Sequence, residues 1–100
     1  MASIVALPTQ PGTLIFSNPH TLKFEKDGSE APAGRGKREN LSIKVSRDDG
    51  KTWSVNKTLD PGKAAYSDLV VLADGTILCL YEADTSIVCA RFNVEWVTAP

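Results

Sequence analysis

Apolar residues gather along this chain in short runs of strand-forming type, and two neighbouring runs make its most distinctive stretch. Residues 69–72 (LVVL) and 77–81 (ILCLY) flank the dipeptide Asp74-Gly75. Asp-Gly between two strand formers predicts a β-hairpin. Neither run alternates with polar residues, so we expect both faces of this hairpin to be covered.

The same pattern predicts an all-β chain of seven strands. They span residues 2–7, 13–17, 41–46, 52–59, 66–72, 76–82 and 86–96. Turns rich in proline, glycine and aspartate separate them, for example Asp60-Pro61-Gly62, and no segment has the apolar spacing of an amphipathic helix. Residues 17–38 form a long, polar, irregular stretch, which is typical of functional or disordered loops.

Composition and charge narrow the classes of function. The chain has 100 residues and a formal net charge of −1, so it makes at most one small domain, and we expect neither nucleic acid nor a membrane as a partner. It contains no apolar run of bilayer length and no N-terminal signal pattern. Because it starts directly in strand-like residues, we expect it to be part of a longer protein. The sequence does not indicate the compartment of that protein, and a secreted or periplasmic parent stays open. His20, the single histidine, lacks partners at metal-ligand spacing, so we expect no metal and no other cofactor.

The turn before Trp53 carries the sharpest local motif. It fits the pattern S-x-D-x-G-x-T-W at every fixed position, and these positions are Ser46, Asp48, Gly50, Thr52 and Trp53. In such a turn the Asp48 carboxylate can accept backbone N–H bonds, and Gly50 can supply a positive φ. We expect Trp53 to fold back as an apolar plug. The pattern resembles the Asp box (BNR repeat) of sialidases and related β-propellers, which indicates a fold rather than a chemistry.

Further segments resemble the C-terminal third of a sialidase (neuraminidase) catalytic domain, a six-bladed β-propeller. They occur in the order and rough spacing of that family, and they are residues 38–41 (RENL), 65–69 (AYSDL), 74–76 (DGT), 79–82 (CLYE) and 91–93 (RFN). The resemblance implies that residues 1–100 are a C-terminal fragment built as an antiparallel meander of four-stranded blades. About two blades are expected, a complete one over residues 2–59 and an incomplete one over residues 65–96.

The resemblance also implies a function, as part of an exo-α-sialidase that hydrolyses terminal sialic acids from glycoconjugates with retention of configuration. Tyr66 would be the nucleophile, Arg38 the last of three arginines that clamp the substrate carboxylate, and Glu82 the support of the first arginine. Arg35 is the alternative to Arg38. The family's acid/base aspartate, its other two arginines and the glutamate that activates the tyrosine have no counterpart in this sequence. We therefore expect the chain alone to be inactive.

These residue types suit that chemistry. Sialic acid carries a carboxylate on the carbon that becomes an oxocarbenium ion, so a carboxylate nucleophile would meet a repulsion that a neutral phenol avoids. A phenol with an ordinary pKa near ~10 needs a base or a nearby charge to attack at neutral pH. An arginine offers the substrate carboxylate two parallel charged donors.

Strand parity groups the candidate residues. Every turn of an up-and-down meander swaps ends, so Arg38, Tyr66 and Glu82 are expected at one end of the strands, and Asp48 and Asp74 at the other.

Two alternatives to this function stay open. One is a non-catalytic Asp-box propeller segment that binds a glycan or a protein, and the other is an inactive truncated chain that folds only by assembly.

The strand of residues 86–96 and the two cysteines carry two further expectations. An unpaired edge on that last strand predicts self-association through exposed strand edges.

A three-residue loop over residues 83–85 would place Cys79 opposite Cys89, within disulfide range. Because nothing indicates an oxidising compartment, two buried thiols are the favoured state.

Overall fold

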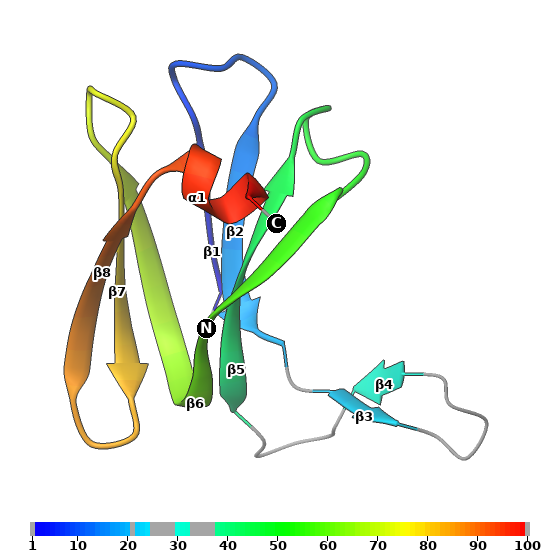
Figure 1. Cartoon of the computed structure of the whole chain (residues 1–100), viewed down its shortest axis with the longest axis vertical. Coiled ribbons are helices and arrows are strands. Elements are labelled where there is room, and N and C mark those ends of the chain that lie inside the picture. Colours follow the sequence, from blue (N-terminus) through cyan, green and yellow to red (C-terminus); the bar gives the residue numbers. More distant parts are fainter. Residues whose placement is uncertain (1, 21, 25–29, 33–37, 100) are drawn as a thin grey trace.

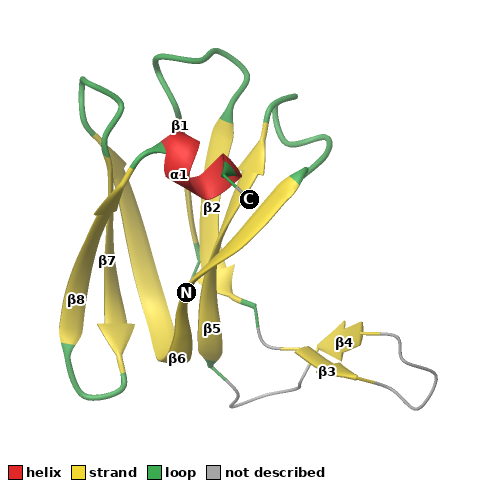
Figure 2. Ribbon diagram, in the orientation of Figure 1, coloured by secondary structure: helices red, strands yellow, loops and turns green. Residues whose placement is uncertain are grey.

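A computed structural model describes residues 2–20, 22–24, 30–32 and 38–99 (Figure 1). Its main feature is a six-stranded antiparallel sheet in the order β1-β2-β5-β6-β7-β8, which confirms the expected all-β meander. The strands are β1 (Ser3–Ala6), β2 (Leu14–Pro19), β5 (Glu39–Ser46), β6 (Val55–Val71), β7 (Ile77–Ala83) and β8 (Ile87–Phe92). Figure 2 shows the sheet curling around the short helix α1 (Val94–Thr98). No helix among the described residues has the length and apolar character needed to cross a membrane.

A separate two-stranded sheet lies within the stretch that was expected to be irregular. It pairs β3 (Leu22–Phe24) with β4 (Glu30–Pro32). Arg35, the alternative clamp residue, falls outside the described residues.

The strand β6 is one element where the sequence predicts two. The expected break at Asp60-Pro61-Gly62 is wrong, because strand pairing continues through these residues. Figure 1 shows β6 bending sharply near its middle, so that it runs down beside β5 and back up beside β7. The ladder with β5 shifts register twice here, and such bulges let a strand bend and accommodate a proline that has no N–H to donate.

The C-terminal end also differs from the prediction. β8 stops at Phe92, and the residues that follow form α1 instead of continuing the strand to residue 96. The Asn93 side chain caps this helix, because its Oδ1 accepts the Trp96 N–H at 2.9 Å. Val94 and Val97 are buried, and this three-residue spacing places both on the helix face that meets β5 and β6.

The concave face of the curled sheet holds the core. Its fully buried apolar side chains come from β2, β5, β7, α1 and the residue after β1, and they are Leu7, Ile15, Leu41, Ile43, Val45, Ile77, Cys79 and Val97. Burying an aliphatic side chain of this size contributes about 1.5–3 kcal/mol. Leu69 on the second arm of β6 belongs to the same cluster, and Val55 and Leu59 on the first arm pack against it, so the core joins the two arms of this bent strand.

The opposite, convex face of the hairpin is open. Val70 is 50% exposed and Leu80 is 51% exposed, so the expectation that both faces are covered is wrong for this chain. The apolar runs lack alternation although only their concave face is packed.

The two cysteines lie on opposite faces of the sheet. β7 and β8 pair Cys79 with Ala90 and Leu80 with Cys89, so the predicted opposition of the two thiols is wrong by one residue. Four residues, not three, separate the paired positions Glu82 and Ile87. Cys79 is buried and Cys89 is exposed, and both are free, which also corrects the expectation of two buried thiols.

Candidate functional site

The Asp-box turn is a closed network of short hydrogen bonds. The Asp48 carboxylate accepts the Thr52 N–H at 2.8 Å, the Thr52 hydroxyl at 2.5 Å and the Ser46 hydroxyl at 2.9 Å. Ser46 Oγ in turn accepts the Gly50 N–H at 2.8 Å. Gly50 has a φ of 89°, a backbone conformation that is strained for residues with a Cβ. A Cβ added at this position would lie 3.5 Å from Leu14 Cδ1. These bonds lower the pKa of Asp48, the Thr52 hydroxyl contributing most.

Trp53 does not plug the core. It is 39% exposed and packs its ring against Phe16 on the convex face, with ring centroids 5.8 Å apart. Trp96, the other tryptophan, is 37% exposed, and the Lys57 ammonium lies 4.2 Å from its ring centroid. Both rings thus cover the rim of the sheet rather than filling its interior.

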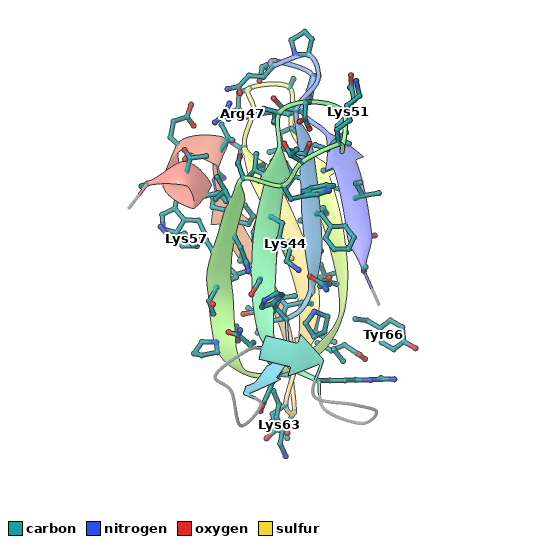
Figure 3. The ribbon with its side chains drawn as sticks, turned by 90° about the vertical axis from the view of Figure 1, so that its right-hand side faces the viewer. Lys44, Arg47, Lys51, Lys57, Lys63 and Tyr66 are labelled. Atoms are coloured by element: carbon teal, nitrogen blue, oxygen red, sulfur yellow. The ribbon has the colours of Figure 1, made fainter. Side chains whose placement is uncertain are left out.

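Arg38, Tyr66 and Glu82 come together at the end of the strands remote from the Asp box. The Arg38 guanidinium carbon lies 5.7 Å from the centroid of the Tyr66 ring, and Glu82 Oε1 accepts the Tyr66 N–H at 3.4 Å. Figure 3 shows Tyr66 projecting outward in the lower half of the view, above Lys63 at the bottom, with Arg47 and Lys51 at the opposite end. Strand parity had grouped the candidate residues in this way.

Backbone pairing at the bend of β6 brings the arginine to the tyrosine. The Ala64 N–H donates to the Arg38 carbonyl at 3.0 Å, two residues before Tyr66. On the far side, Ala64 pairs with Ala83, next to Glu82. The bend thus carries the three candidate residues on adjoining strand ends, which is why they meet although they are far apart in sequence.

The site spans two solvated hollows. Tyr66 lines the smaller one, of about 220 Å³, and Glu82 borders both. The larger hollow, of about 570 Å³, is lined by residues at these strand ends, among them Arg38, Lys63 and Glu82. Tyr66 itself is 55% exposed. The Lys63 ammonium lies 4.0 Å from the Asp84 carboxylate, but both side chains are open to solvent, so this pair contributes little to stability. Among the described residues no cluster of three or more side chains is arranged to hold a metal ion.

Asn40 is a supporting residue that sequence reasoning missed. Its amide donates to the His20 carbonyl at 3.1 Å and accepts the Thr58 hydroxyl at 3.0 Å, so it ties β2 and β6 to the start of β5. Asn40 has a φ of 60°, a conformation that asparagine tolerates better than most residues. An asparagine two positions after the candidate Arg38 was the available signal.

A buried tyrosine lies behind the site and was also missed. The Tyr81 hydroxyl donates to Asp60 Oδ2 at 3.0 Å, within the bent part of β6. Burial, helped by this bond, raises the pKa of Tyr81 to about 12. The chain's two tyrosines therefore differ in environment, since Tyr81 is packed in the core and Tyr66 is exposed to solvent.

Comparison with known proteins finds sialidases that are similar to this chain. A sialidase of Micromonospora viridifaciens is 45% identical over 97 residues, which cover 96% of this chain and 14% of the relative. Sialidases of two Vibrio cholerae O1 strains are each 34% identical over 87 residues, or 85% of this chain and 10% of theirs. The chain thus spans a small part of the length of the curated relatives it matches. No family model matches it.

The curled antiparallel meander with its Asp-box turn defines an all-β protein of propeller-like architecture. The identity to three sialidases covers nearly the whole chain, including both the Asp box and the cluster at the opposite end. The chain is a sialidase-related segment.

Proposed function

We propose that this segment supplies the nucleophile and one carboxylate clamp of an exo-α-sialidase. Tyr66 Oη attacks the anomeric carbon of a terminal sialic acid as a base outside this chain takes the phenol proton, and Arg38 binds the substrate carboxylate through its guanidinium fork. The glycosidic bond breaks as an acid outside this chain protonates the leaving oxygen, and water later releases the sugar with retained configuration. The observation that carries the proposal is the meeting of Arg38, Tyr66 and Glu82 at one solvent-open end of the sheet, where the Arg38 guanidinium lies over the Tyr66 ring and Glu82 accepts the Tyr66 N–H.

Glu82 has a supporting role in this proposal. One of its carboxylate oxygens accepts the Tyr66 N–H, and the remaining acceptor capacity is free to hold a further arginine of the whole enzyme. The proposed domain layout assigns one blade to residues 2–59 and an incomplete one to residues 65–96. The bend of β6 lies between these two ranges, which supports placing the blade boundary there.

A chimaera tests the proposed chemistry. The matching 97-residue region of the Micromonospora viridifaciens sialidase is replaced by this chain, and hydrolysis of a fluorogenic sialoside is measured. We expect turnover that Tyr66→Phe reduces by about 10³-fold or more in kcat, because a nucleophile acts as part of a coupled set. Arg38→Lys should raise KM, since an ammonium cannot bind a carboxylate in bidentate fashion.

Tyr81→Phe in the same chimaera is the matched control, because it removes the hydroxyl of the chain's other tyrosine, which is buried and donates to Asp60. It should leave kcat within a few-fold of the parent value. Full turnover by the Tyr66→Phe chimaera would overturn the assignment of the nucleophile. Binding of sialosides without any turnover in the parent chimaera would instead support a non-catalytic, glycan-binding segment.

A further inference from the structure

The first of two exposed apolar surfaces covers the convex side of β1, β2, β5 and the first arm of β6. We name it the Lys44 face, after the lysine at its centre in Figure 3. Strand pairing places Ile4, Phe16, Lys44 and Asn56 in one row across it. These side chains, with Trp53 and Val55, line a hollow of about 550 Å³.

Lys44 is the charged member of this row. Its ammonium lies 5.9 Å from the centroid of the Phe16 ring, and partial burial lowers its pKa. Among the described residues no carboxylate lies within ion-pair distance of it. A half-buried cation that lies beside aromatic rings and has no anionic partner is a favourable binding site for a carboxylate.

The second surface covers the convex side of the other arm of β6 with β7 and β8, and we name it the Leu80 face. Strand pairing places Asp68, Leu80 and Cys89 in one row. Val70, Leu80 and Ile87 are 50%, 51% and 64% exposed, so the patch is aliphatic and open. Asp68 stands directly beside Leu80, whereas the cation of this face, Arg91, lies farther along, opposite Leu78.

We propose that the Lys44 face of one copy of this chain docks on the Leu80 face of a second copy. Leu80 and its aliphatic neighbours fill the hollow beside Phe16, and Lys44 meets Asp68. The Lys44 face carries a cation beside its apolar centre, and the Leu80 face carries the Asp68 carboxylate directly beside its own. Exposed apolar patches of this kind mark interaction sites, and opposite charges fix which faces meet.

The contact is head-to-tail, so assembly does not end at a dimer. Every copy presents one face of each kind, and two different faces generate a ring when the rotation closes and a filament when it does not. A symmetric contact of two Lys44 faces would bring two lysines together without a counter-charge. Tyr66 lines the same hollow as Asp68, Leu80 and Ile87, so this contact borders the candidate site, but the association does not depend on catalysis by Tyr66.

Charge reversal tests this contact on the 100-residue chain by sedimentation over a range of concentrations. We expect the unmodified chain to associate at micromolar concentration. Lys44→Glu and Asp68→Lys should each weaken association about tenfold or more. The double variant, and an equimolar mixture of the two single variants, should restore it, because each then offers opposite charges again.

Two controls keep the test decisive. Lys51→Glu makes the same charge change in the exposed Asp-box loop and should leave association unchanged. Because Asp68 Oδ1 accepts a hydrogen bond from the Ser3 hydroxyl at 3.2 Å, Asp68→Asn serves as a milder second variant, and circular dichroism verifies that each variant is folded. A monomer at all concentrations would overturn the proposal. Association that is unchanged in both charge-reversal variants would also overturn the proposal, and would indicate pairing along the edge of β8.

Discussion

At the scale of single residues, a few polar side chains determine the turns of this protein. Asp48 is the clearest case, because one exposed carboxylate accepts three hydrogen bonds from Ser46 and Thr52. Asn93 caps a helix in the same manner with one bond to the Trp96 N–H. Such bonds are local, so they hold turn geometry whatever the rest of the sheet does.

Removing the Asp48 carboxylate should destabilise the turn. Because hydrogen bonds depress the pKa of Asp48, its contribution to stability is present above the ordinary aspartate pKa near ~3.9 and is lost as pH falls through the lower folded-state value. We expect Asp48→Asn to lower the thermal midpoint at pH 7 and to flatten its decline between about pH 4 and 2. Asp49→Asn is the matched control, since Asp49 has a φ of 60° that asparagine also adopts. Equal acid profiles for both variants would contradict this role of Asp48.

At the scale of elements, the bend of β6 organises the molecule. It gives one strand two arms, which pair with β5 and with β7, and it turns the ends of those strands toward each other. The Tyr81–Asp60 hydrogen bond braces this bend from inside the core.

Tyr81→Phe should cost about 1 kcal/mol at neutral pH, the usual net value of a hydrogen bond. The raised pKa of Tyr81, about 12, means that the folded state favours the neutral phenol. This contribution to stability is complete below the ordinary tyrosine pKa near ~10 and is lost as pH rises through about 12. Urea unfolding at pH 7 and pH 11 should therefore show a smaller alkaline loss in Tyr81→Phe than in the parent. Tyr66→Phe, at an exposed position, should retain the parent's alkaline loss.

The register of β7 with β8 predicts two thiols of unequal reactivity. Cys89 is exposed, whereas burial raises the pKa of Cys79 to about 11, so Cys79 has almost no thiolate at pH 8. A thiol reagent at pH 8 should modify one site quickly and the second only in denaturant. Cys89→Ser should abolish the fast phase and Cys79→Ser should preserve it. An unreduced mass two units below that of the dithiol would contradict the observed register.

At the scale of the whole molecule, the proposed chemistry requires residues that lie outside this chain. The strand ends bring together a tyrosine, an arginine and a glutamate, but Tyr66 lies open to water and its described partners include no group placed to protonate a leaving oxygen. The sialidases that the chain resembles are many times longer.

We therefore expect no detectable hydrolysis of a fluorogenic sialoside by the 100-residue chain, since a coupled catalytic set loses most of its effect when members are absent. The measurement is a long incubation at high protein concentration, with Tyr66→Phe run beside it. Cleavage that disappears in Tyr66→Phe would show that the chain is sufficient on its own.

Local sequence signals account for the turns, the strand type and the end of the sheet at which each candidate residue lies. Asp-Gly and the Asp-box positions act through bonds within a few residues, so they can be recognised without the fold. Strand parity then follows from counting turns, and it was enough to group Arg38, Tyr66 and Glu82.

Only the tertiary structure decided pairing register, the bend and the open faces. A shift of one residue in β8 separates Cys79 from Cys89, because register depends on which side chains fill the concave core and not on either strand alone. Asp60-Pro61-Gly62 is a typical turn signal, yet bulges against β5 and the bond to Tyr81 keep it within β6. The continuous apolar runs of β6 and β7 likewise indicate strands with two apolar faces. Only the fold determines that this chain packs the concave face and leaves the convex face open.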